Sequence, residues 1–167
     1  MYESRASRRA CSRVYTRGKQ VSDHSEFASE LAILRGEGPP LEDPDPDSLA
    51  EREVNRRWAA MRRLGENNVY EADDLIRRQL YASDPTLRAE AIHVLLGIWR
   101  RSDLLGYVIE LAADRDEYPM VRMVAIEALG LSDLVENESV SKFVRELAVR
   151  EDEPEVKRAA TKILERG

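Results

Sequence analysis

One pattern of residues occurs three times along this chain at nearly constant spacing. The segments "DPTLRAEAIHVLLG", "YPMVRMVAIEALG" and "EPEVKRAATKILERG" align on Pro85, Pro119 and Pro154, which lie 34 and 35 residues apart. A period of this length is typical of stacked helical hairpins, because one hairpin cannot bury its apolar faces alone and similar neighbours share a continuous core. The spacing therefore predicts an array of helix pairs.

Apolar periodicity and the placement of Pro and Gly predict where the helices lie. Each of the three prolines is expected in the first turn of a helix, where a missing amide hydrogen costs nothing. Ser48 and Glu51 have the spacing of a capping box, and Gly65 is expected to end a helix in the left-handed conformation. The predicted helices span residues 22–35, 49–64, 70–81, 85–97, 103–113, 119–130, 138–149 and 154–165.

Charge and composition divide the chain into four segments. Residues 1–20 carry a net charge of +5 and the remainder carries −11, so the acidic body disfavours a general nucleic-acid binder. We expect a disordered basic arm over 1–21, with a transit peptide or a nucleic-acid-binding arm as open alternatives. A short helix over 22–35, an acidic Pro-rich linker over 36–48 and a repeat domain over 49–167 follow.

Positions counted from each proline predict the core and a set of ion pairs. Positions +2, +6, +9 and +10 fall on one helical face and are expected to be buried. Position +3 is basic in all three copies (Arg88, Arg122 and Lys157), although a cation near a helix N-terminus is unfavourable. We expect each to pair with an acid of a nearby turn, such as Asp84, Asp116 or Asp152, in a ladder between repeats. An anion-binding role for these cations is the alternative.

These segments resemble the second helices of HEAT repeats, particularly the short type found in phycobilisome lyases. Their common form, D-P-x-V-R-x-x-A-A-x-A-L-G, is shared by the copies at 84–97, 118–130 and 153–167, and a degenerate copy without the proline lies at 49–64. The resemblance implies an all-α fold, a right-handed α-solenoid of about three HEAT-like helical hairpins plus N-terminal helices. It implies function only broadly, since such repeats serve scaffolds, adaptors, inhibitors and a few enzymes.

The residue pattern predicts no catalytic site, no cofactor and no metal site. The chain has two histidines and one cysteine, Cys11, and it contains no zinc-ligand spacing, no phosphate-binding glycine loop and no nucleotide fingerprint. We therefore expect that the protein is not an enzyme. The single cysteine suits a reducing compartment such as the cytoplasm, and no apolar run approaches the length of a membrane span.

The second helices are expected to line the concave side of the solenoid with positions +1, +4 and +8. Trp and Met are favoured at protein contacts and are unusual on a solvated face. The alternative is that the tryptophan packs under the N-terminal helix and that the methionines cover a curved core. The candidate partner-binding residues are Trp58, Arg62, His93, Met120, Met123, Glu127 and Arg158.

The expected function is a non-catalytic protein–protein interaction module, an adaptor, scaffold or small inhibitor, whose partner is another protein. A subunit of a bilin-lyase-type enzyme is the alternative that the repeat type suggests, and absorbance after incubation with a bilin would test it. A HEAT-like DNA glycosylase is a third possibility, disfavoured by the net charge of −11 over residues 21–167. The sequence does not predict the oligomeric state.

Overall fold

A computed structural model of the protein describes residues 24–42, 45–131, 134 and 137–165. The basic arm predicted for residues 1–21 lies outside the described residues. No strand occurs within the described part of the chain, so the all-α prediction is confirmed. The helices are η1 His24–Phe27, α1 Ala28–Arg35, α2 Pro46–Glu66, η2 Tyr70–Ala72, α3 Asp73–Gln79, α4 Pro85–Ile92, η3 His93–Ile98, η4 Ser102–Leu104, α5 Leu105–Ala113, α6 Pro119–Leu129, α8 Glu138–Arg150 and α9 Pro154–Leu164.

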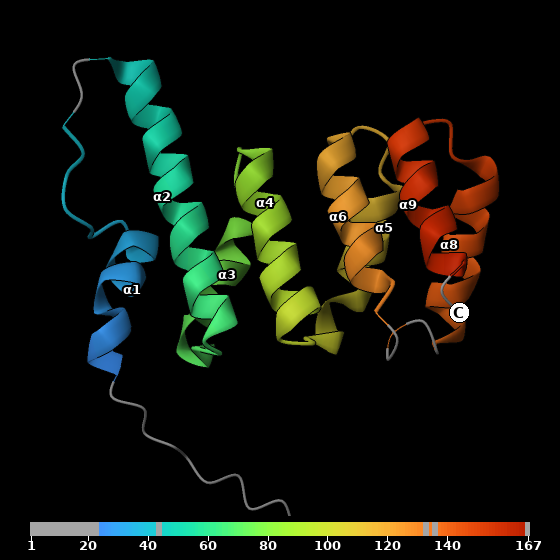
Figure 1. The fold of residues 1–167 in the computed structure, drawn as a ribbon, viewed down its shortest axis with the longest axis horizontal. Coiled ribbons are helices and arrows are strands. Elements are labelled where there is room, and N and C mark those ends of the chain that lie inside the picture. Colours follow the sequence, from blue (N-terminus) through green and yellow to red (C-terminus); the bar gives the residue numbers. More distant parts are fainter. Residues whose placement is uncertain (1–23, 43–44, 132–133, 135–136, 166–167) are drawn as a thin grey trace, which may run out of the picture.

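The helices stack as successive hairpins along one axis (Figure 1). Helix α3 pairs with α4 and its continuation η3, α5 pairs with α6, and α8 pairs with α9. The second helices contact one another in chain order, α2 against α4, α4 against α6 and α6 against α9, and α1 packs on α2. Each hairpin thus buries its apolar face on the next, and the α-solenoid expected from the repeat period is confirmed.

The start of α2 differs from the prediction. The capping box at Ser48 and Glu51 was wrong, because the helix begins three residues earlier, at Pro46. Asp45 is the N-cap, and its carboxylate accepts a hydrogen bond from the Asp47 amide at 3.1 Å. An Asp followed by Pro supplies both the acceptor and the helical φ angle, so it starts the helix before the serine is reached. Asp84 and Pro85 begin α4 in the same way.

Gly65 serves close packing rather than helix termination. The predicted left-handed ending was wrong, because α2 continues to Glu66 and the positive φ of 56° belongs to Asn68. A Cβ on Gly65 would lie 2.8 Å from both γ-carbons of Val94, and one on Gly130 would lie 2.5 Å from Ile163. Both glycines therefore allow a second helix to approach the side chain of the next repeat.

The buried face follows the predicted positions with one exception. Positions +2 and +6 are buried in all three copies that carry the proline, including Leu87, Val121 and Val156 at +2. Leu164 at +10 was expected in the core, but it is exposed, whereas Ile163 at +9 is buried. The absence of a side chain at Gly130 leaves room for the Ile163 side chain between the last two second helices.

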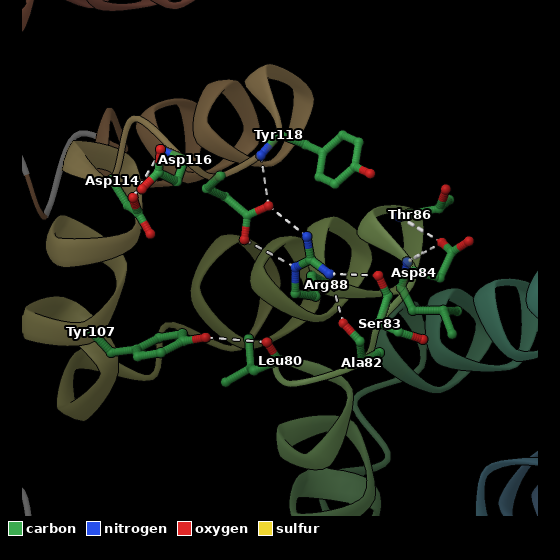
Figure 2. Close-up of polar contacts among 12 residues, drawn as sticks. Leu80, Ala82, Ser83, Asp84, Thr86, Arg88, Tyr107, Asp114, Asp116 and Tyr118 are labelled. Atoms are coloured by element: carbon green, nitrogen blue, oxygen red, sulfur yellow. Dashed lines mark hydrogen bonds and ion pairs between the residues drawn. The ribbon is translucent and has the colours of Figure 1, made fainter.

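Arginines at position +3 connect consecutive hairpins, as the ladder hypothesis required. The guanidinium of Arg88 donates to the carbonyls of Ala82 and Ser83, at 2.6 and 2.9 Å, within its own hairpin (Figure 2). It also donates to the carboxylate of Glu117, in the turn of the next hairpin, with an Nε–Oε2 distance of 3.0 Å. These contacts offset the unfavourable position of the cation near the positively charged end of the helix dipole.

A second ion pair of the same kind connects the next two hairpins. Arg122 donates to the Ala112 carbonyl at 3.1 Å, and it forms a buried ion pair with Glu151 of the following turn. Burial alone would raise the pKa of Glu151, but hydrogen bonds from backbone amides and from Arg122 outweigh it and lower that pKa. The prediction that Asp84, Asp116 and Asp152 supply the acids was wrong, because Glu117 pairs with Arg88 and Glu151 pairs with Arg122.

Candidate functional site

The second helices enclose a groove of about 590 Å³. Its walls come from α2, α4, η3, α6 and α9, so all four second helices contribute. Most of the lining residues stand at positions +1, +5, +8 and +12 of their copies, and Trp58 and Ala89 at +4 and Ala128 and Ile163 at +9 border them. The lining residues are Trp58, Arg62, Thr86, Ala89, Glu90, His93, Gly97, Met120, Val124, Glu127, Ala128, Leu131, Ala159, Lys162 and Ile163.

Five of the seven candidate residues line this groove. They are Trp58, Arg62, His93, Met120 and Glu127. Met123 and Arg158 do not line it; Met123 is partly buried and packs against the core, and Arg158 is exposed. Both stand at position +4 of their copies, a position that lines the groove in the earlier copies, at Trp58 and Ala89, but not in these two.

Trp58 and Arg62 form the wall on α2. The Arg62 guanidinium lies over the Trp58 ring, 4.9 Å from its centroid, a geometry that favours a cation–π contact. The Nε atom of Arg62 is also 3.3 Å from Glu90 Oε1 and 3.8 Å from Glu66 Oε1. Arg62 is thus shared between an aromatic ring and two acids that it contacts loosely.

Glu90 is the unexpected member of the site. It is only 5% exposed, while the equivalent +5 positions of the next two copies hold Val124 and Ala159. Its buried Oε1 has no hydrogen-bond partner, and neither has the buried Nε of Arg62, although the two atoms form an ion pair. Burial raises the pKa of Glu90, and Arg62, His93 and Trp58 reverse this only in part.

A π-helical segment shapes the wall beside Glu90. Helix α4 passes at His93 into η3, which runs to Ile98 with π-type winding. Such segments are often found at functional sites because they change the direction of the side chains that follow. The absence of a side chain at Gly97 leaves room for the imidazole, since a Cβ there would lie 3.3 Å from His93 Nδ1.

The groove therefore combines an apolar surface with four charged side chains. Val124, Ala128 and Leu131 supply much of the apolar part, and Met120 is 38% exposed at its edge. No group of three metal-ligating side chains occurs among the residues that the structure describes. Such a surface is suited to hold a chain segment through burial of apolar area and through charge pairing.

Helical hairpins stacked in one direction, with a groove along their second helices, define a helical-repeat solenoid. A family model for HEAT repeats matches residues 74–165, which is more than half of the chain, so the protein belongs to the HEAT-repeat family. A comparison with curated proteins found no significant match, and a comparison with solved structures found none either. Within the described residues no helix is both long and apolar enough to cross a bilayer.

Proposed function

We propose that the protein is a non-catalytic interaction module, an adaptor, scaffold or small inhibitor, and that it binds one partner protein in the groove on its concave side. HEAT repeats are generally protein-interaction modules, and solenoids use such extended concave surfaces for binding. A cytoplasmic location belongs to the same proposal.

The observation that carries the proposal is the mixture of side chains that line the groove. Trp58 and Met120 are of the types enriched at protein contacts, and they lie on different helices of the same groove. A partner segment seated there would cover Met120, Val124 and Leu131, whose apolar surface would gain from removal of water.

The experiment compares one groove variant with one control. The tagged protein is used to capture partners from its native cells, and binding of each captured protein is then measured with purified components. Met120→Glu should weaken a true partner at least about tenfold, because it places a charge on apolar contact area. Val149→Glu is the matched control, since Val149 is 75% exposed on α8, outside the groove.

The two variants separate the groove from the rest of the surface. Both should keep the unfolding temperature of the parent protein, because both positions are exposed. Equal binding by the Met120→Glu variant and the parent protein would contradict the proposal, and so would loss of binding in the Val149→Glu variant alone.

A further inference from the structure

The groove contains a buried carboxylate whose ion pairing is incomplete. In the ladder, Arg88 meets Glu117 with two nitrogen–oxygen contacts and adds two carbonyl acceptors. Glu90 has no such arrangement, because its Oε1 is buried without a hydrogen bond. A buried carboxylate in this state is costly, and this one lies in the groove wall.

The charged side chains of the groove follow a defined order from helix to helix, with acids in the middle and bases at the ends. Arg62 on α2 is followed by Glu90 on α4, Glu127 on α6 and Lys162 on α9. The two central helices therefore present acids and the two outer helices present bases. A ligand that crosses the middle of the groove meets negative charge above an apolar floor of Val124, Ala128 and Leu131.

Arg62 covers Glu90, but its guanidinium has a second acid within reach. Its side chain is 41% exposed, and Glu66 on the same helix, at 3.8 Å, offers a second acid. By leaving Glu90 for Glu66, Arg62 would uncover both the carboxylate and the Trp58 ring. The ring already holds a guanidinium at 4.9 Å, so a cation from a ligand fits the same place.

We propose that the groove recognises a basic side chain of the partner, an arginine or a lysine, which displaces Arg62 and pairs with Glu90. The aliphatic stem of this side chain lies on the apolar floor, and its charged end lies between Glu90 and Trp58. Neighbouring apolar residues of the partner contact Met120 and Leu131. The inference rests on the proposed function and adds the chemistry of the residue that is recognised.

The test is a selection of random peptides displayed on phage against the intact protein, run in parallel against Glu90→Gln. The selected peptides should carry a lysine or arginine next to apolar residues with the parent protein and lose this preference with the variant. For one synthetic peptide, replacing its basic residue by glutamine should weaken binding to the parent protein roughly tenfold to a hundredfold. Thermal unfolding checks that the variant is folded.

Arg62→Gln gives a second and opposite readout. Removing the competing guanidinium should strengthen binding of the basic peptide several-fold, and a simple loss of groove structure would weaken it instead. The inference is overturned if the peptides bind in the groove without a basic residue, or if Glu90→Gln leaves the basic preference intact. Peptides that bind Met120→Glu unchanged, or a selection that enriches none, would contradict the proposed function itself.

Discussion

Replacing Gly65 by alanine tests whether the second helices are in direct contact. Alanine is favoured over glycine inside a helix by about 0.5–1 kcal/mol, so an isolated α2 would be stabilised. The added Cβ would lie 2.8 Å from two carbons of Val94, about 0.7 Å inside an ordinary carbon–carbon contact of ~3.5 Å. Val94 is fully buried and β-branched, so it cannot turn away without moving its helix.

The magnitude follows from these two opposed effects. Overpacking of a core costs about 1–3 kcal/mol, which leaves a net loss of about 0.5–2 kcal/mol for Gly65→Ala after the helix preference is subtracted. For a chain of this size the loss lowers the unfolding temperature by roughly 1–8 °C. Gly106→Ala is the matched control, because Gly106 is helical and nothing lies within 4 Å of its added Cβ. That change should stabilise by about 0.4–1 kcal/mol.

Urea and thermal unfolding measure these changes in the single variants Gly65→Ala, Gly106→Ala and Val94→Ala. The same measurements are made on the double variant that combines Gly65→Ala with Val94→Ala. Val94→Ala alone should cost about 2 kcal/mol, since it removes two buried methyl groups. The double variant should be about 1 kcal/mol or more better than the sum of the two single changes, because the contact is relieved. Stabilisation by Gly65→Ala as large as that by Gly106→Ala would refute the close packing of α2 on η3.

The remaining predictions concern charge. Glu151→Gln should cost about 3–5 kcal/mol in urea unfolding at neutral pH, because it breaks a buried ion pair, whereas Asp152→Asn, at an exposed pair with Arg115, should change stability by less than ~0.5 kcal/mol. Since the pKa of Glu151 is lowered by folding, its contribution is present above the unfolded value of about 4.3 and is lost as the pH falls through the folded value. The contribution of Glu90 to stability depends on pH in the opposite sense. Its raised pKa makes the ionised form costly at neutral pH, so Glu90→Gln should raise the unfolding temperature at pH ~7. This gain should shrink as the pH falls toward ~4. Equal pH dependence of the two glutamine variants would contradict both assignments.

The helical framework could be predicted because its signals are local. The period of the prolines and the apolar stripe together determine how the hairpins stack, and position +3 indicated an ion-pair ladder. The partner acids were misassigned because they depend on turn geometry. Glu117 and Glu151 lie two and three residues before their prolines, and this offset between the turns has no counterpart in the repeat pattern.

The groove could be predicted only in part. Counting +1, +4 and +8 left out position +5, so Val124 was missed, and it included Met123, which does not line the groove. Glu90 was missed because a charged residue is normally expected to face solvent, and only the apolar residues at +5 of the following copies hint otherwise. The π-helical turn beside it depends on packing and has no local signal.

The most direct test of the central claim is site-specific photocrosslinking to an identified partner in solution. A crosslinking residue is placed at Met120, in the groove, and in a separate variant at Val149, outside it. Binding in the groove predicts a covalent adduct with the partner from position 120 and none from position 149. An adduct from position 149, with none from position 120, would contradict the account.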